Sequence, residues 1–504
     1  MADGLILAID QGTTRTRAFL FDRAGAPLAS TGAELDQIYP RPGWVEHDPL
    51  EIWRLTRDVT MAMVDEAGGA RHIVSVGITN QRETTLLWDR ATGEPLYNAI
   101  VWQDRRTADL CRRLAAEGFD THVRERTGLV LDPYFSATKL AWLLDNVDGA
   151  RARAERGELC FGTVESWLVW NLSGGTRHVT DASNACRTLL YDIHRGDWDD
   201  EMLRRLSVPR AVLPEVVACD GDIAETVPGL FGGTLQIAGM AGDQHAALIG
   251  QACFAPGTTK ATYGTGCFVL TTTGADAVRS SHGLLTTLGW RRADSVSYAL
   301  EGSIFMAGAT LQWLRDGLGL FTDYAEAEAM IACAEPQSGV YLVPAFAGLG
   351  APYWDADARG AIVGLTRGAG AAEIVRAGLE AVAFQTRDLL AAFAADLATA
   401  GIDAPDRLRV DGGMARNDWL LQAIADQTGL VVERSRMTDA TVLGAACLAG
   451  LGAGVFTTLD EIAGNWSAER SFEPRMSADE REARHAGWRG AVARVLSDRG
   501  PGPR

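Results

Sequence analysis

The sequence predicts an α/β protein built from two related domains. Strand-like apolar runs alternate with amphipathic helical patterns along the 504 residues, an order typical of α/β folds. A strand, a Gly-Thr turn and a second strand are expected at residues 5–22, and the same pattern returns at residues 258–274. We therefore expect two similar domains that face each other across a cleft, with a boundary near residue 250.

The composition excludes several classes of protein. A net charge of −18 argues against nucleic acid or an anionic membrane as the main partner. Eight scattered cysteines without a C-x-x-C pair favour reduced thiols over a disulfide framework. The first residues lack the basic region of a signal peptide, and no apolar run approaches the ~18 residues of a membrane span. A cytoplasmic protein without membrane insertion is expected.

The first hairpin has the chemistry of a phosphate site. Backbone N–H groups of a tight Gly-Thr-Thr turn converge on an anion, and Thr13 and Thr14 add hydroxyl donors. Arg15 and Arg17 supply positive charge, but Asp10 would repel phosphate unless a cation stood between them. Mg²⁺ bound by a carboxylate and phosphate oxygens resolves this conflict. Taken alone, the stretch is as compatible with an ordinary polar hairpin as with a phosphate site.

Two helices are well marked by their end signals and their apolar spacing. Asp48 can cap the first helix, Pro49 occupies its first position and Glu51 can complete a capping box. In the second helix, apolar residues keep helical spacing from Val375 to Leu397 until Gly401 ends it.

Two polar clusters follow apolar runs in the first half of the chain. Arg82 and Glu83 come after a predicted strand and could offer donors and an acceptor to the hydroxyls of a polyol; a surface ion pair is the alternative. Asp243 follows a glycine at the end of another apolar run. A carboxylate there could serve as a general base for a phosphoryl acceptor, or as a helix N-cap.

The second half repeats the anion-binding patterns. In the turn YGTG, Thr265 and nearby amides could hold a second phosphate, although a plain hairpin has the same pattern. Further on, a strand ends in Asp411-Gly412-Gly413 and a helix begins near Asn417. A nucleotide can approach such a Gly-Gly turn closely and meet the positive end of the helix dipole. A tightly packed strand–helix connection would look alike.

Several stretches together resemble the FGGY carbohydrate kinases, and among them those that phosphorylate glycerol. In chain order the matching stretches are DQGTT, QIYPRPGWVEHDPLEIW, GITNQRETT, YNAIVWQDRRT, TGLVLDPYFSATK, AGDQHAAL, TYGTGCF, ALEGSIFMAGATLQWLRD, PAFAGLGAPYWDADARG and RVDGGMARND. The resemblance runs from about residue 5 to about residue 490.

The resemblance implies a fold of the actin-like ATPase superfamily. Two duplicated actin/hexokinase-like (ribonuclease H-like) α/β domains would flank a cleft for ATP and substrate. An N-terminal domain, residues 1–250, would carry the glycerol site and the first phosphate loop. A C-terminal domain, residues 251–504, would carry the nucleotide site and the second phosphate loop.

The implied activity is ATP-dependent phosphorylation of glycerol to sn-glycerol 3-phosphate in glycerol catabolism, by a homodimer or homotetramer that uses Mg²⁺. Asp243 matches the family's catalytic base and Asp10 its carboxylate near Mg²⁺. The positions that match glycerol contacts are Arg82, Glu83, Trp102, Tyr134, Asp243, Gln244 and Phe268. The positions that match nucleotide contacts are Thr13, Thr14, Arg15, Arg17, Thr265, Gly308, Gln312, Gly413 and Asn417.

The sequence departs from the family pattern at two positions. Leu235 stands where some bacterial relatives carry an arginine that binds fructose 1,6-bisphosphate, so inhibition by that ligand is not expected. His245 replaces a common glutamine, and either a structural role or a side chain that reaches the cleft is compatible with the sequence. Another polyol, a ketose or dihydroxyacetone remains an alternative substrate. A nucleotide-switched binding protein of the wider fold is the alternative from another class.

Overall fold

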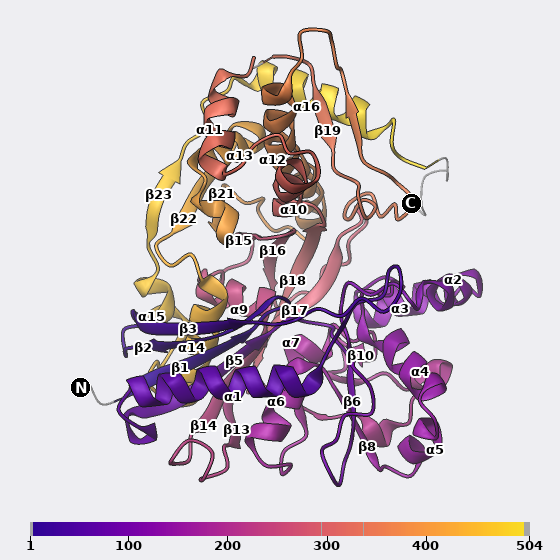
Figure 1. Ribbon diagram of the computed structural model, residues 1–504, viewed down its shortest axis with the longest axis vertical. Helices are drawn as coiled ribbons and strands as arrows, with labels where there is room; N and C mark the ends of the chain where they lie inside the picture. The colour runs from indigo at the N-terminus through magenta and orange to yellow at the C-terminus, as the bar shows by residue number, and fades with distance from the viewer. Residues whose placement is uncertain (1–3, 294, 336, 498–504) are drawn as a thin grey trace.

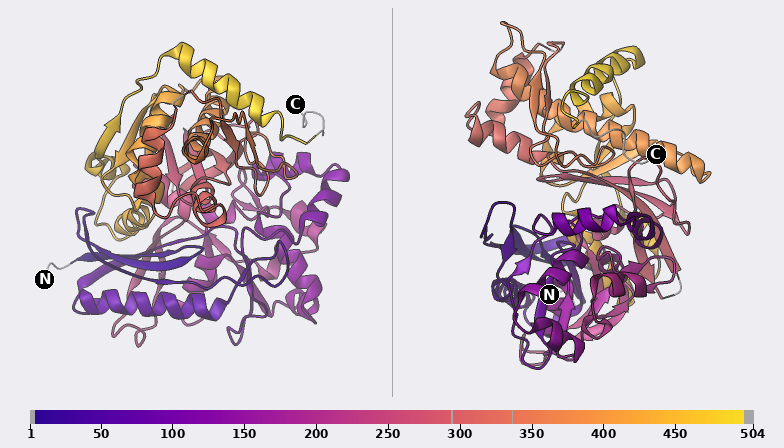
Figure 2. Two further views of the ribbon diagram at one scale, coloured as in Figure 1. Left: turned by 45° about the horizontal axis from the view of Figure 1, so that its top comes forward. Right: turned by 90° about the vertical axis from the view of Figure 1, so that its right-hand side faces the viewer.

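The computed structural model describes residues 4–293, 295–335 and 337–497, and these form two lobes. In Figure 1 the indigo and magenta first half fills the lower lobe, and most of the orange and yellow second half fills the upper lobe. The side view in Figure 2 shows the lobes as separate layers joined by long strands near the middle of the chain. Each lobe is built around one mixed β-sheet.

The lower lobe contains a six-stranded sheet in the order β13-β14-β5-β1-β2-β3. β1 is antiparallel to β2 and parallel to β5, so the predicted first hairpin is confirmed. The strands are β1 (Leu5–Gln11), β2 (Arg15–Phe21), β3 (Pro27–Glu34), β5 (Ile73–Asn80), β13 (Asp220–Glu225) and β14 (Gln236–Gly242).

The upper lobe contains a seven-stranded sheet in the order β17-β18-β16-β15-β21-β22-β23. β15 is antiparallel to β16 and parallel to β21, which confirms the second predicted hairpin. The strands are β15 (Thr259–Tyr263), β16 (Cys267–Gly274), β17 (Leu285–Arg292), β18 (Ser295–Ile304), β21 (Arg407–Asp411), β22 (Val431–Ser435) and β23 (Ala468–Phe472).

Six strands of the upper sheet repeat the topology of the lower sheet, and β17 is an additional strand beside β18. In each sheet, three antiparallel strands (β3-β2-β1 and β18-β16-β15) are followed by two parallel partners (β5-β14 and β21-β22) and an antiparallel edge strand. The predicted α/β class with a duplicated domain is therefore confirmed. Each hairpin turn lies at the same place in its own sheet.

The helices and short strand pairs complete the lobes. The helices of the first half are α1 (Pro49–Glu66), α2 (Ala108–Ala116), α3 (Asp120–Thr127), α4 (Ser136–Asn146), α5 (Ala150–Glu155), α6 (Val164–Leu172), α7 (Ala182–Ala185), α8 (Asp200–Leu206) and α9 (Asp243–Gly250). Those of the second half are α10 (Gly308–Gln312), α11 (Tyr324–Cys333), α12 (Ala371–Thr399), α13 (Asp418–Thr428), α14 (Ala440–Gly452), α15 (Leu459–Asn465) and α16 (Ala478–Val492). The two-stranded pairs are β4 (Glu46–His47) with β7 (Ala99–Ile100), β6 (Leu86–Asp89) with β8 (Leu159–Gly162), β9 (Val179–Asp181) with β12 (Glu215–Val217), β10 (Tyr191–Asp192) with β11 (Asp197–Trp198), and β19 (Tyr341–Val343) with β20 (Ala361–Val363).

Both marked helices form where they are predicted. Asp48 caps α1 by accepting a hydrogen bond from the Leu50 N–H. The predicted capping box is wrong in one detail, because Glu51 instead accepts a bond from Arg54 at 3.2 Å. The apolar face of α12 is buried against the upper sheet.

α14 lies late in the chain but packs on the sheet of the lower lobe, against β1, β5 and β14 (Figure 1). The contact is a close backbone approach: a Cβ at Gly77 would lie 2.1 Å from the Ala445 carbonyl oxygen, and one at Gly239 would lie 2.2 Å from the Ala449 nitrogen. Glycine is therefore required on both strands. The division at residue 250 stays a prediction, because α14 returns to the first lobe and brings the preceding loop to the first hairpin.

Candidate active site

The turn of the first hairpin is closed by a backbone bond and has one exposed and one half-buried threonine. The Gly12 N–H donates to the Arg15 carbonyl at 2.9 Å. Thr14 and Arg15 are exposed, whereas the Thr13 hydroxyl accepts a bond of 2.9 Å from the Trp102 indole N–H. This contact joins a predicted nucleotide residue to a predicted glycerol residue, so the two predicted subsites are neighbours at Thr13.

Asp10 lies beneath this turn at the centre of a charged cluster. The Arg17 guanidinium contacts the Asp10 carboxylate at 2.6 Å and the Asp439 carboxylate at 2.5 Å. Burial raises the pKa of Asp10, Arg17 opposes that rise, and the carboxylates of Asp243 and Asp439 add to it. Arg17 is held by two carboxylates in this structure, and its predicted phosphate contact stays a prediction.

Arg82 and Glu83 follow β5 and are almost fully buried, at 2% and 1% exposure, so the alternative of a surface ion pair is wrong. Arg82 donates to both carboxylate oxygens of Glu301, at 2.6 and 3.1 Å. Arg187 donates to Glu83 at 2.8 Å. Glu83 has a φ of +61°, a conformation that non-glycine residues seldom adopt and that is often found at functional sites.

Asp243 is the first residue of α9, directly after β14. Gly242 occupies the N-cap position, and the Asp243 side chain is 31% exposed. Its carboxylate lies 3.2 Å from Arg82 Nε. The general-base position predicted from the sequence therefore has a cation on one side and an open face on the other.

Gln244 is fixed by a lysine that the sequence analysis did not select. The fully buried Lys260 donates to the Gln244 side-chain oxygen at 2.6 Å and to the Thr262 hydroxyl at 3.0 Å. Burial lowers the pKa of Lys260, and the Asp411 carboxylate opposes that shift. Because the oxygen of Gln244 accepts from Lys260, its amide N–H groups are what the side chain has left to donate.

Three aromatic rings form a wall beside the polar groups. Trp102 meets Tyr134 edge-on with ring centroids 5.7 Å apart, and Phe268 at 6.3 Å. The Arg82 guanidinium lies 5.6 Å from the Phe268 centroid. The structure thus brings together the seven residues predicted to bind glycerol: Arg82, Glu83, Trp102, Tyr134, Asp243, Gln244 and Phe268.

The upper lobe contains a cavity of about 500 Å³, a size typical of ligand sites. It lies between the second hairpin turn, α10, α11 and the turn before α13. Five residues predicted to bind nucleotide line it: Thr265, Gly308, Gln312, Gly413 and Asn417. The other four, Thr13, Thr14, Arg15 and Arg17, come from the lower lobe and are not among its lining residues.

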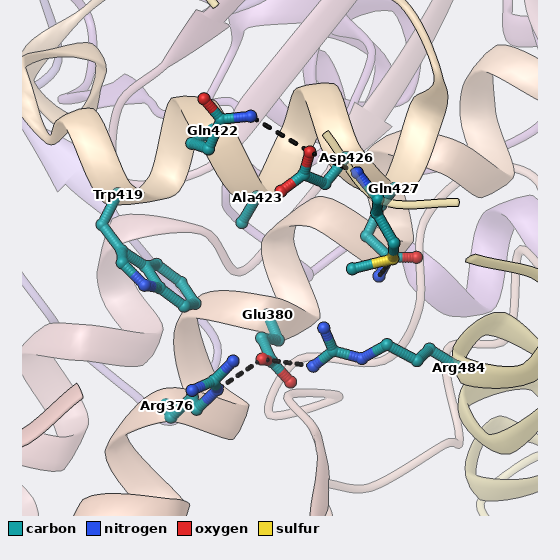
Figure 3. A pocket seen from close by; sticks show the side chains of 9 residues that line it. Arg376, Glu380, Trp419, Gln422, Ala423, Asp426, Gln427 and Arg484 are labelled. Carbon is teal, nitrogen blue, oxygen red and sulfur yellow. Dashed lines mark hydrogen bonds and ion pairs between the residues drawn. The ribbon is translucent and has the colours of Figure 1, made fainter. Parts of the chain in front are cut away.

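A smaller cavity of about 100 Å³ lies elsewhere in the upper lobe (Figure 3). Its walls carry an ion-pair chain in which Glu380 accepts from Arg376 at 2.7 Å and from Arg484 at 2.6 Å. No residue predicted to bind substrate or nucleotide lines it. Because this cavity is small and its Glu380 carboxylate is already paired with two arginines, we do not assign it to the site described above.

The two departures from the family pattern both have buried side chains. Leu235 is 1% exposed and packs in the apolar core of the lower lobe. His245 is fully buried, its Nε2 lies 3.2 Å from the Thr287 hydroxyl, and burial lowers its pKa well below the usual value. A structural position for His245 is favoured over a contact with substrate.

Four charged residues of the site were missed by the sequence analysis: Arg187, Lys260, Glu301 and Asp439. A usable signal existed for Glu301 and Lys260, because each is a charged residue inside an otherwise strand-like run. Such residues are almost never fully buried unless they are paired. Neither run reveals which partner, far along the chain, offsets the charge.

The comparisons with known proteins identify the class of this duplicated-sheet fold as a two-domain carbohydrate kinase. The chain belongs to the FGGY family of carbohydrate kinases: the N-terminal domain of that family matches residues 5–250 and its C-terminal domain matches residues 259–453.

Relatives cover nearly the whole chain. It is 56% identical to a glycerol kinase of Alcanivorax borkumensis over 495 residues, which are 97% of this chain and 98% of the relative. It is 54% identical to glycerol kinase 1 of Pseudomonas aeruginosa, covering 98% and 99%. A solved structure of Plasmodium falciparum glycerol kinase with ADP superposes with a TM-score of 0.91 at 36% identity, covering 99% of both chains.

Proposed function

We propose that the protein transfers the γ-phosphoryl group of ATP to a terminal hydroxyl of glycerol, giving sn-glycerol 3-phosphate and ADP, as a step of glycerol catabolism. The observation that carries this proposal is the Asp243 carboxylate, part exposed and 3.2 Å from Arg82 Nε, beside the aromatic wall. Glycerol has hydroxyls on one edge and C–H bonds on the other, so it needs both surfaces. The glycerol kinase relatives at 54–56% identity support the same substrate.

In the proposed reaction Asp243 accepts the proton of the attacking hydroxyl. The oxygen forms a bond to the γ-phosphorus as the bond to the β,γ-bridging oxygen breaks, and ADP carries away that electron pair. The Arg82 guanidinium and the Gln244 amide, fixed by Lys260, orient the other hydroxyls. The Trp102 and Phe268 rings exclude water from the carbon edge of the substrate.

We propose Mg²⁺ as the metal that accompanies ATP, where it would offset phosphate charge. The residues fit this ion: the buried Asp10 carboxylate lies among other carboxylates that raise its pKa, a field that a divalent cation would relieve. Among the described residues no cluster of three or more metal-binding side chains occurs, so Asp10 would share the ion with phosphate oxygens.

An ATP-consumption assay over a panel of glycerol, dihydroxyacetone, erythritol and xylulose tests the substrate. We expect glycerol to give the highest kcat/KM. The side chains of Arg82, Asp243 and Gln244 would each bind a hydroxyl, and the aromatic wall is short enough to fit a three-carbon triol. A higher kcat/KM on a pentulose would assign the site to a different FGGY substrate. ATP turnover that no added polyol accelerates would support a nucleotide-switched protein.

A matched pair of glycines tests the nucleotide cavity. A Cβ at Gly412, where φ is +89°, would lie 2.4 Å from the Tyr263 carbonyl oxygen, whereas one at Gly413 meets nothing within 4 Å. Gly412→Ala should lower the free energy of unfolding by about 1–3 kcal/mol, and a denaturation curve measures this loss. Gly413→Ala should leave stability unchanged yet raise the KM for ATP about 3- to 10-fold, because its methyl group projects where the nucleotide approaches the backbone. An unchanged KM in Gly413→Ala would place the nucleotide elsewhere.

We further propose a cytoplasmic homodimer or homotetramer. The eight cysteines are free thiols in the structure, which suits a reducing compartment. No helix of the described residues has the length and hydropathy needed to cross a bilayer. Light scattering coupled to size-exclusion chromatography measures the assembly, and a monomeric mass would remove the oligomer from the proposal.

A further inference from the structure

A buried cluster of four charged side chains connects the two lobes at the glycerol site. Arg82 and Glu83 follow β5 of the lower sheet, Arg187 follows α7, and Glu301 belongs to β18 of the upper sheet. All four are at most 2% exposed. Two cations face two anions, so the cluster is formally neutral.

Glu301 is the member that both guanidinium groups share. Its two oxygens accept from Arg82 at 2.6 and 3.1 Å, and Arg187 adds a bond of 2.9 Å. The two arginines hold the pKa of Glu301 at about 2, against the effect of burial. The carboxylate is therefore charged at any working pH, and both arginines keep an anionic partner.

The bonds to Glu301 fix the direction in which Arg82 points. Both terminal nitrogens of Arg82 donate to Glu301, one of them also lies 3.4 Å from the Tyr134 hydroxyl, and Nε faces Asp243 at 3.2 Å. A guanidinium is planar, so its orientation follows from two bonds at one end. Any rotation that moved Nε away from Asp243 would break the bonds to Glu301.

We propose that Glu301 is a positioning residue of the glycerol site, which holds Arg82 in the orientation that presents Nε to Asp243 and the guanidinium to the bound polyol. The inference rests on the proposed function. Glu301 itself is fully buried, so it acts through Arg82 and not by touching substrate. Because β18 belongs to the upper sheet, the polar half of the glycerol site in the lower lobe is completed by the other lobe.

A purely structural role makes a different prediction. If Glu301 only offsets buried charge, its loss should destabilise the fold without selecting one substrate. If Glu301 positions Arg82, its substitution should lower kcat/KM for glycerol selectively. That effect should disappear in a variant in which Arg82 is already replaced by lysine. Residues that act through one another show non-additive effects in a double-mutant cycle.

The experiment is a cycle of Glu301→Gln, Arg82→Lys and the double variant in the full-length protein. Glu301→Gln should reduce kcat/KM for glycerol about 10²-fold, the size expected when a reacting group is misplaced. The KM for ATP should stay within about 2-fold of wild type. In the Arg82→Lys background the same substitution should have almost no further effect.

Two outcomes would overturn the proposal. The first is a double variant whose loss of kcat/KM for glycerol equals the product of the two single losses within about 2-fold. The second is a KM for ATP that rises as much as the KM for glycerol. Glu301→Asp keeps the charge and decides the case if Glu301→Gln does not fold. It should melt near the wild-type temperature yet still lose about 10-fold in kcat/KM for glycerol, because the shorter carboxylate cannot hold both Arg82 nitrogens. A wild-type protein that turns over another polyol would refute glycerol as substrate and not the positioning role, and the cycle would then be measured with that polyol.

Discussion

Asp243→Asn is expected to lower kcat with glycerol by about 10²- to 10⁴-fold, the usual contribution of a positioned general base. Asparagine keeps the shape of the side chain but cannot accept the proton of the attacking hydroxyl. The open face of Asp243 beside Arg82 is the place where that hydroxyl would lie. Steady-state kinetics of phosphoryl transfer to glycerol measure the loss.

Binding should be largely preserved in this variant. We expect the KM for ATP to change less than about 3-fold, because Asp243 is not among the residues that line the upper-lobe cavity. Asp48→Asn is a matched control, since it makes the same chemical change at the N-cap of α1, where asparagine caps as well as aspartate. Near-normal turnover in Asp243→Asn would remove Asp243 from proton transfer.

The parts of the site that local sequence patterns encode were predictable. Both hairpin turns, the Gly-Gly turn and the position of Asp243 depend on residues adjacent in the chain, and each forms where the sequence places it. The adjacent pair Arg82 and Glu83 was likewise recognisable as polar residues at a strand end.

The partners of those residues were not predictable, because a charged side chain does not encode which distant group offsets it. Arg82 and Glu301 are 219 residues apart, and Arg17 and Asp439 are 422 apart. Asp439 reaches the first hairpin only because the following helix, α14, packs on the first sheet. That helix is apolar on every face, so its sequence shows that it is buried but not against which lobe.

The same cross-lobe contacts determine the second large effect, that of Arg82→Lys. We expect kcat/KM for glycerol to fall by about 10²- to 10³-fold, because a single ammonium cannot satisfy Glu301 and also face Asp243 in the geometry of the guanidinium. The positive charge is retained, so Glu301 stays offset and the protein should fold. Michaelis constants for glycerol and ATP, with a melting curve, measure the outcome.

Arg54→Lys provides the control for the side-chain exchange itself. Arg54 is half exposed on α1 and pairs with Glu51 at 3.2 Å, a surface contact whose loss should change kcat/KM less than about 2-fold. If Arg82→Lys behaved like this control, the planar fork would have no part in recognition. A selective loss of kcat/KM for glycerol would instead show that the polyol is recognised by an arginine whose orientation is fixed by Glu301 of the opposite lobe.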